Sequence, residues 1–344
     1  MKYSVILFVD SSLIGGIESH LIAMSKLLER YNIMSSVLFY QDHNNRELYK
    51  RLENANITFG FAGGNLKSLN EILKMFPRSA LLHTHGYKAS IMGKFVCRWQ
   101  NRPCISTYHA GEAGTGKVYF YNKLDKLLSY FSLNFAVSSK LTQELYNAEL
   151  LENFIPVNES TKDLGLKNND QLNVGFVGRL SHEKGPDIFI ETAKRFNTEN
   201  LKFHMFGDGP MVHELDMSAV SYHGQCEQQQ IWQQLDVLVI CSRAEGLPMV
   251  ALEAMAHGVL VIASPVGQLP QIIKHLSNGL MMTESTSDAL HKQLNNVLML
   301  SVDQRSYMLG NAQRLVKQRF SGEQQFKQLD RVYNSSLLAS LPSF

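Results

Sequence analysis

Short runs of apolar residues alternate along the chain with longer segments in which apolar positions recur every three to four residues. The run Tyr3–Val9 is typical of a buried strand, and the apolar positions from Ile17 to Leu28 have helical spacing. This alternation of strand and helix predicts parallel sheets with helices on both faces. Further strand-like runs are Ser36–Tyr40, Ala80–Thr84, Cys104–Tyr108, Asn134–Ser138, Val174–Gly178, Phe203–Phe206, Val220–His223, Val237–Cys241 and Val259–Ala263, and helical segments include Asp187–Phe196 and Val250–His257.

The strand-like runs fall into two series, which the polar segment Asn153–Asn173 separates. Its Asn and Ser residues are typical of a linker, so we place a domain boundary near residue 165. The sequence thus predicts an α/β protein of two doubly wound, Rossmann-like domains, residues 1–165 and 166–322. Ligands of such domains bind at the carboxyl ends of the strands, so we look for chemistry in the loops that follow strands.

Composition and charge describe an ordinary globular protein and argue against several other classes. The chain has 344 residues, 44% of them hydrophobic and 19% charged, which is enough for two domains. Its net charge of +2 argues against a general nucleic-acid-binding protein. The apolar runs are far shorter than the ~20 residues of a spanning helix, and the first run is too short for a secretory signal. Four cysteines without C-x-x-C spacing predict a reducing compartment, so we expect a cytoplasmic protein.

Basic residues are concentrated in the first half of the chain. Residues 1–165 carry 18 Lys and Arg against 14 Asp and Glu, and seven of the basic residues lie between Lys88 and Lys126. Aromatic residues are interleaved with them, from Trp99 to Phe131. Such a stretch can hold a protein against an anionic membrane surface, here the inner face of the cytoplasmic membrane. The alternative is a solvated basic surface over a packed aromatic core.

Two glycines and three histidines follow strands of the predicted first domain. Gly15 and Gly16 precede the first helix, where the backbone can approach a ligand closely and the helix N-terminus favours an anion. This loop matches neither G-x-G-x-x-G nor Walker A, and a plain tight turn is the alternative. His83, His85 and His109 could bond a phosphate or hydroxyl, or serve as structural hydrogen-bonding groups. No third ligand is evident beside His83 and His85, so we expect no metal site.

Charged residues also follow the first strand of the predicted second domain. Arg179 and Lys184 lie five residues apart on the loop before the helix that starts near Pro186. Arg supplies a bidentate fork and Lys a mobile point charge, so the two could converge on a diphosphate. The alternative is a pair of solvated loop charges.

The densest group of candidate residues runs from Glu245 to Gly258, after the strand Val237–Cys241. Pro248 is suited to the first turn of a helix and Gly258 to its end, which leaves Glu245 in the loop and Glu253 within the helix. An acceptor carboxylate beside free N–H donors suits a polyhydroxylated ligand joined to an anion, such as a sugar phosphate. The N–H groups expected to face that ligand belong to Gly246, Leu247 and Met249.

These loops, in this order, resemble retaining glycosyltransferase family 4, whose members have the GT-B fold of two Rossmann-like domains facing each other across a cleft. The most specific match is Glu-Gly-Leu-Pro from Glu245, followed by Glu-Ala-Met-Ala-x-Gly from Glu253. The resemblance covers nearly the whole chain, and implies that its C-terminal helix, residues 323–344, joins the first domain. The other matching segments are Gly15-Gly16, His83-x-His85-Gly86, His109, Gly178-Arg179-Leu180, Glu183-Lys184-Gly185, Phe206-Gly207-Asp208-Gly209 and Tyr333.

The resemblance also implies roles for these residues. His109 and Glu245 would be the catalytic candidates, since both would position the donor sugar. The implied route is a front-face one in which the leaving phosphate accepts the proton of the acceptor, so that catalysis rests on positioning and electrostatics. No metal or other cofactor is implied, because cationic side chains and helix N-termini stabilise the leaving diphosphate. The donor-binding residues would be Gly15, Gly16, Arg179, Lys184, Gly246, Leu247, Pro248, Met249 and Glu253.

We therefore expect a metal-independent, retaining transferase that moves a sugar from a nucleotide diphosphate sugar to a saccharide or lipid-linked glycan in bacterial surface polysaccharide biosynthesis. A UDP-sugar is favoured over a GDP-sugar as donor. One departure from the family pattern is Gln271, where family members usually have Glu, and it puts the contact of that side chain in doubt. The alternatives are a nucleotide-sugar 2-epimerase of related fold and a non-catalytic GT-B-like subunit of a biosynthetic complex.

Overall fold

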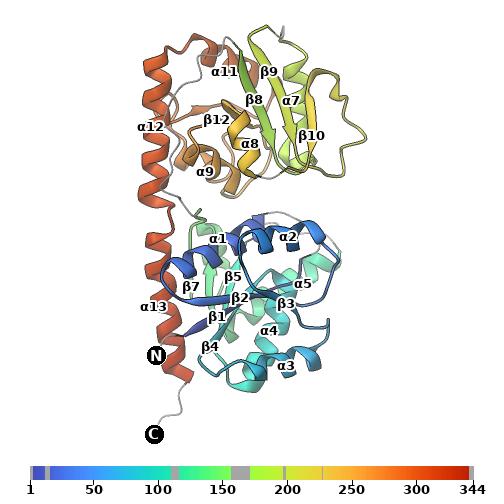
Figure 1. Cartoon of the computed structure of the whole chain (residues 1–344), viewed down its shortest axis with the longest axis vertical. Helices are drawn as coiled ribbons and strands as arrows, with labels where there is room; N and C mark the ends of the chain where they lie inside the picture. Colours follow the sequence, from blue (N-terminus) through green and yellow to red (C-terminus); the bar gives the residue numbers. More distant parts are fainter. Residues whose placement is uncertain are drawn as a thin grey trace. The chain divides into compact units, whose positions relative to one another are not determined.

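The structure, a computed structural model, describes residues 3–11, 16–109, 116–155, 171–196, 199–226 and 228–340. It divides into two compact units (Figure 1). The first unit comprises residues 1–156 together with 322–344, and the second comprises residues 157–321. Sequence positions far apart thus share the first unit, whereas the second is one continuous stretch of chain.

The first unit is built on a seven-stranded parallel sheet with strand order β3-β2-β1-β4-β5-β6-β7. The strand order reverses beside β1, as in doubly wound folds. The strands are β1 (Ser4–Val9), β2 (Met34–Phe39), β3 (Phe59–Phe61), β4 (Ala80–His85), β5 (Cys104–Tyr108), β6 (Leu133–Ala136) and β7 (Ala148–Leu150). The helices are α1 (Gly16–Arg30), α2 (Arg46–Asn54), α3 (Leu66–Met75), α4 (Tyr87–Gln100), α5 (Lys117–Leu127), η1 (Leu128–Phe131), α6 (Ser139–Glu144) and α13 (Glu323–Ser340).

The second unit repeats this plan around a six-stranded parallel sheet with strand order β10-β9-β8-β11-β12-β13. Its strands are β8 (Leu172–Val177), β9 (Leu201–Phe206), β10 (Ser221–Gly224), β11 (Val237–Ile240), β12 (Leu260–Ala263) and β13 (Leu280–Met281). Its helices are η2 (His182–Lys184), α7 (Pro186–Ala193), η3 (Met217–Ala219), α8 (Gln228–Gln234), α9 (Met249–Ala256), α10 (Leu269–Ile272), α11 (Ser287–Met299) and α12 (Val302–Arg319). The prediction of two parallel sheets in Rossmann-like domains is confirmed.

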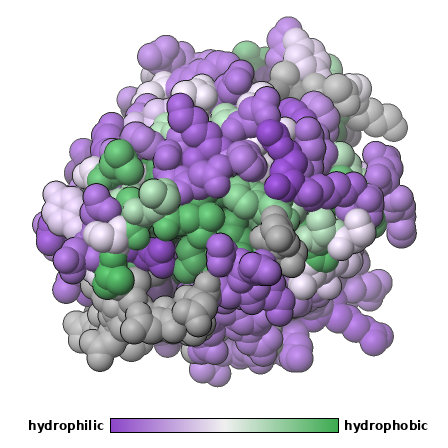
Figure 2. Space-filling view, turned by 90° about the horizontal axis from the view of Figure 1, so that it is seen from above, coloured by the Kyte–Doolittle hydropathy of each residue, from purple (hydrophilic) through white to green (hydrophobic). Residues whose placement is uncertain are grey.

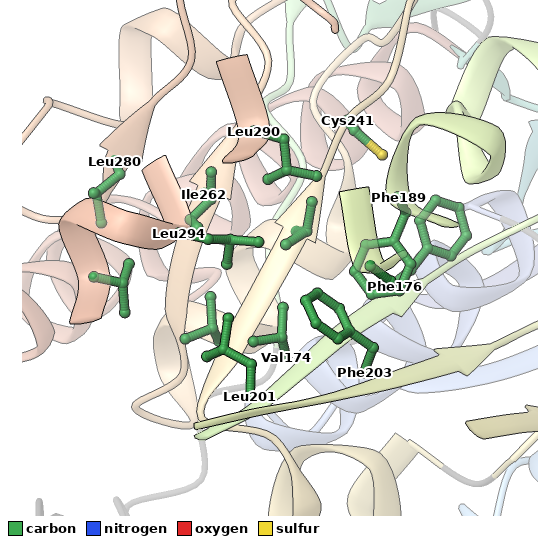
Figure 3. Packing of buried hydrophobic residues seen from close by; sticks show 14 of the residues in the cluster. Val174, Phe176, Phe189, Leu201, Phe203, Cys241, Ile262, Leu280, Leu290 and Leu294 are labelled. Atoms are coloured by element: carbon green, nitrogen blue, oxygen red, sulfur yellow. The ribbon is translucent and has the colours of Figure 1, made fainter. Parts of the chain in front are cut away.

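The core of the second unit shows why its strands are almost continuously apolar. Phe189 of α7 packs with Phe176 of β8 and Phe203 of β9, with ring centroids 5.9 and 5.6 Å apart (Figure 3). Beside α7, Leu290 and Leu294 of α11 are fully buried in the same core. Each such side chain stabilises the fold by roughly 1.5–3 kcal/mol relative to exposure. The helices therefore cover the sheet, and the loops at the strand ends are not part of this core.

The basic stretch between Lys88 and Lys126 is not a continuous solvated surface. Lys94 is buried, and its ammonium group donates to Asp125 Oδ1 and Tyr108 Oη, both at 2.7 Å. Arg102 is also buried, and donates to backbone carbonyl oxygens at the end of α3, including that of Leu73 at 2.7 Å. These two cations stabilise the fold of the first unit.

Aromatic side chains of the same stretch are instead exposed. Trp99 of α4 is 79% exposed and Phe120 of α5 is 64% exposed. None of the helices in the described part of the chain is both long and apolar enough to cross a bilayer. Figure 2, a view from above Figure 1, shows a face on which hydrophilic residues surround a band of hydrophobic ones. We define the aromatic surface as the exposed side chains of α4, α5 and η1, namely Phe95, Trp99, Tyr119, Phe120, Tyr130 and Phe131.

Candidate functional site

The loops after β8 and β11 lie side by side at one edge of the second sheet. The two strands pair in parallel, so their carboxyl ends meet at the same edge. The first loop leads through η2 into α7 and carries Lys184, and the second leads into α9 and carries Glu245. Two candidate residues 61 positions apart thus become neighbours.

Lys184 and Glu245 form an ion pair. The Lys184 ammonium donates to Glu245 Oε1 at 2.5 Å, and the Ser242 hydroxyl donates to the same oxygen at 2.8 Å. The carboxylate side chain is only 7% exposed, whereas the lysine side chain is 30% exposed. An ammonium group has three donors, so Lys184 can hold Glu245 and still present N–H groups to an anion. The pair therefore fixes a positive charge at the edge of the sheet.

A second ion pair holds the two loops together. The Arg243 guanidinium donates to both carboxylate oxygens of Asp187, at 2.8 and 2.5 Å, and its backbone N–H donates to the Glu183 carbonyl at 2.8 Å. Hydrogen bonding to Arg243 lowers the pKa of the Asp187 carboxyl, and the same contact raises the pKa of the guanidinium. Both groups thus stay charged at neutral pH, and Lys184 and Glu245 are positioned by a rigid support.

Two glycines allow these loops to approach other backbone segments closely. Gly185 has φ +70°, and a Cβ there would lie 2.4 Å from the Cys241 carbonyl oxygen. Gly267 has φ +57°, and a Cβ there would lie 2.2 Å from the carbonyl oxygen of Glu245. A side chain at either position would displace the backbone beside the ion pair. It would also strain the backbone of the substituted residue, because φ is positive there.

The segment after Glu245 enters α9 as the sequence pattern indicates. Pro248 is the N-cap residue, with extended backbone, and Met249 begins the helix. Gly246 is exposed, Leu247 is buried, and Glu253 lies within the helix, half-buried. The Glu253 carbonyl oxygen accepts hydrogen bonds from the backbone and the ring Nδ1 of His257, which lies at the end of the helix.

The remaining donor-binding candidates are Arg179 of the second unit and Gly15 and Gly16 near the start of the chain. Arg179 follows β8 on the same edge of the sheet and is exposed. Gly16 is the first residue of α1, and a Cβ there would meet nothing within 4 Å. Gly15 lies outside the described residues.

In the first unit, His109 belongs to a group of packed histidines. Its Nε2 lies 3.0 Å from His85 Nδ1, and its ring centroid lies 4.7 Å from that of His20. Burial lowers the pKa of His20 to about 4, and also lowers the pKa values of His85 and His109. His83 is engaged with Tyr333 Oη at 2.6 Å and Thr107 Oγ1 at 2.7 Å, so its role here is structural.

The sequence reasoning missed two features of the first unit. His20 lies inside an amphipathic helix, where its spacing is that of a core position, and nothing local distinguishes it. Asp10, at the end of β1, pairs with Lys88 at 2.7 Å and His43 at 2.8 Å. An acidic residue directly after a buried strand was the available signal for this cluster.

The second unit matches a known family. Residues 171–299 match the family model described as "Glycosyl transferases group 1". An uncharacterized glycosyltransferase of Methanocaldococcus jannaschii, MJ1607, is 25% identical over 75% of this chain and 75% of its own length. The UDP-Gal:alpha-D-GlcNAc-diphosphoundecaprenol alpha-1,3-galactosyltransferase of Escherichia coli is 26% identical over 68% of this chain and 70% of its own.

Solved structures share the fold of the whole chain. HepE of Anabaena, in a crystal structure with UDP-glucose, superposes with a TM-score of 0.80 at 20% identity. The superposition covers 96% of this chain and 99% of HepE, and the shared architecture is GT-B. The family match over residues 171–299, the glycosyltransferase relatives and the GT-B fold together support a group 1 glycosyltransferase.

Proposed function

We propose that the chain is a retaining, metal-independent glycosyltransferase of family 4 that uses a nucleotide diphosphate sugar. The observation that carries this proposal is the Lys184–Glu245 pair, held at the edge of the second sheet by Arg243 and Asp187. A UDP-sugar is the preferred donor class, and no cofactor takes part. The names of the Escherichia coli enzyme and of the HepE complex, which include UDP-Gal and UDP-glucose, support this choice.

In this proposal the residues act by binding and orienting the donor. Lys184 and Arg179 neutralise the diphosphate as negative charge grows on it. Glu245 orients both the sugar hydroxyls and the Lys184 ammonium, Glu253 bonds the ribose, and His109 positions the sugar. The bond between the sugar C1 and the diphosphate oxygen breaks while a bond from C1 to the acceptor oxygen forms. The proton of the acceptor hydroxyl goes to the leaving phosphate.

The acceptor we propose is a saccharide or lipid-linked glycan in bacterial surface polysaccharide biosynthesis. This follows the printed names of relatives, among them the diphosphoundecaprenol-dependent enzyme and an O-antigen biosynthesis glycosyltransferase of Escherichia coli, WbnH. WbnH is 29% identical over 42% of this chain and 43% of its own length. Asp10 with Lys88 and His43 supplies a polar cluster at the carboxyl edge of the first sheet that suits hydroxyl groups.

Release of nucleotide from a panel of UDP-, GDP- and ADP-sugars, with and without EDTA, tests the donor proposal. We expect release from a UDP-sugar at a rate that EDTA leaves unchanged. A mixture of lipid-linked and free glycans is included, since turnover can require the acceptor. Formation of a 2-epimer without acceptor would favour the epimerase instead. If no donor releases nucleotide, and no donor raises the melting temperature of the protein, a non-catalytic subunit would be favoured.

We also propose that the aromatic surface binds the anionic inner face of the cytoplasmic membrane. Amphipathic aromatic rings favour the boundary between headgroups and acyl chains. Since Lys94 and Arg102 are buried, the apolar contact contributes more than charge, and the exposed Arg98 and Lys123 add the electrostatic part.

Sedimentation with vesicles tests the membrane proposal. We expect the chain to bind anionic vesicles, and the double variant Phe120→Ser, Phe131→Ser to bind at least tenfold more weakly. The matched control is Met299→Ser, Tyr307→Ser, since both residues are exposed apolar side chains of the second unit. Equal losses in both double variants, or no vesicle binding by the unaltered chain, would contradict the proposal.

A further inference from the structure

We propose that His20, His85 and His109 form a binding site for a transition-metal cation of the Zn²⁺ class within the first unit. One ring nitrogen from each of the three residues lies within 4.8 Å of the others. The residues come from α1, the end of β4 and the loop after β5, so the fold and not a local motif brings them together. Of these three residues the proposed sugar transfer uses only His109, which positions the sugar without a metal, so a cation bound here would compete with that role.

Unpartnered nitrogens point to a ligand at this position. His20 is fully buried, and neither of its ring nitrogens has a hydrogen-bond partner among the residues that the structure describes. Within the same described part of the chain, His85 Nε2 is also buried without a partner. A buried polar atom left unpaired is destabilising, and three of them in one cluster are unusual. A cation bound between the rings would take up the lone pair that His20 leaves unused and would replace the hydrogen bond between His85 Nδ1 and His109 Nε2.

The donor set indicates which cations fit. Three imidazole nitrogens without a carboxylate favour Zn²⁺, Co²⁺, Ni²⁺ or Cu²⁺ over Mg²⁺ and Ca²⁺, which prefer oxygen. Tetrahedral bonds of about 2.0–2.1 Å place the ligand nitrogens roughly 3.4 Å apart. The ring nitrogens here lie within 4.8 Å of one another, so the widest separation must close by up to about 1.4 Å. His85 Nδ1 and His109 Nε2 are already 3.0 Å apart. The half-buried His109 gives an ion a route from solvent.

A supporting residue fixes the orientation of this cluster. The His83 ring stacks on His85 with centroids 4.5 Å apart, and its two nitrogens are held by Tyr333 and Thr107. His83 is thereby removed from the ligand set and acts as a positioning residue. The sequence pairs His83 with His85 as ligand candidates, whereas the geometry replaces His83 with His20.

Calorimetric titration of the chelator-stripped full chain with Zn²⁺ tests the site. We expect one Zn²⁺ per chain, and with Co²⁺ the visible absorption of a tetrahedral nitrogen-rich complex. The variant His20→Phe keeps an aromatic ring of similar shape and removes the unpartnered nitrogens, so it should fold and lose at least tenfold in Zn²⁺ affinity. Its melting temperature without metal reports whether it has folded.

A competing binding site for Zn²⁺ is the pair His204 and His223 of the second unit, in which His204 Nδ1 lies 3.0 Å from His223 Nε2. The matched control is therefore His223→Phe, which should leave the Zn²⁺ affinity unchanged. Absence of stoichiometric binding, or undiminished binding by a folded His20→Phe variant, would overturn the proposal. Because the titration needs neither donor nor acceptor, nucleotide release that persists beside a failed titration would leave the proposed transferase function intact.

Discussion

At the scale of single residues, the candidate site depends on charges that support one another. Glu245 is nearly buried, and a carboxylate in such a position needs compensation by a cation or by hydrogen bonds. Lys184 and Ser242 supply both, and Arg243 with Asp187 holds the loops on which they lie. The arrangement is thus prepared before any ligand arrives, which is what electrostatic stabilisation of a leaving group requires.

Removal of either proposed diphosphate cation should weaken donor binding. Lys184→Ala and Arg179→Ala should each reduce the binding free energy of the UDP-sugar by about 1.5–3 kcal/mol, the range for charge-assisted hydrogen bonds. Isothermal titration calorimetry of each variant with the UDP-sugar measures this change in binding free energy. Lys194→Ala is the control, because Lys194 pairs with Asp216 on the exposed surface of the same unit. Unchanged donor affinity in both site variants would remove the diphosphate assignment.

Residues differ in how far the sequence reveals them. Lys184 and Glu245 follow apolar strands in loops rich in glycine, so topology alone predicts that they share an edge. The supporting Arg243–Asp187 pair could not be predicted, since its geometry depends on how two loops fold against each other. His20 could not be predicted either, because a buried histidine in a helix looks like any other core position.

At the scale of secondary structure elements, α13 completes the first unit. The Tyr333 hydroxyl bonds to His83 of β4, and the Tyr3 hydroxyl donates to Asp330 at 2.6 Å. Tyr31, directly after α1, stacks on Phe326 with ring centroids 3.6 Å apart. The helix therefore contributes both apolar and polar contacts to a sheet made from the other end of the chain.

The Tyr333 hydroxyl should stabilise the first unit measurably. Tyr333→Phe leaves a buried nitrogen of His83 without its partner, and we expect a loss of about 1–3 kcal/mol in the free energy of unfolding. Urea denaturation followed by circular dichroism measures it. Tyr146→Phe, at an exposed tyrosine of the same unit, is the control. A loss no larger than that of the control would show that the hydrogen bond contributes nothing to stability.

Long elements were predictable and short ones were not. Strands such as β5 and β9 contain runs of apolar residues that periodicity identifies, and their positions agree with the prediction to within two residues. The strands β3, β7 and β13 have only three, three and two residues, and pairing with a neighbour makes them strands. Propensity carries too little information over so few positions.

At the scale of the whole molecule, the second unit is formed by one continuous stretch of sequence, whereas the first is formed by two separate stretches. A fragment of residues 157–321 contains the complete six-stranded sheet with its helices, so we expect it to unfold cooperatively on its own. A fragment of residues 1–156 lacks α13 and should have no cooperative transition. Thermal melting of each fragment followed by circular dichroism tests this. A cooperative transition in residues 1–156 would show that α13 is dispensable for that fold.

The division of the first unit has a consequence for its synthesis on the ribosome. Residues 1–156 leave the exit tunnel before the second unit, but the helix that packs beside Tyr3 and Tyr31 is translated after it. The unit that is translated second can therefore complete its fold earlier than the unit translated first. While the chain is still growing, the surface later covered by α13 is open to water and to other nascent chains, where it is prone to aggregate.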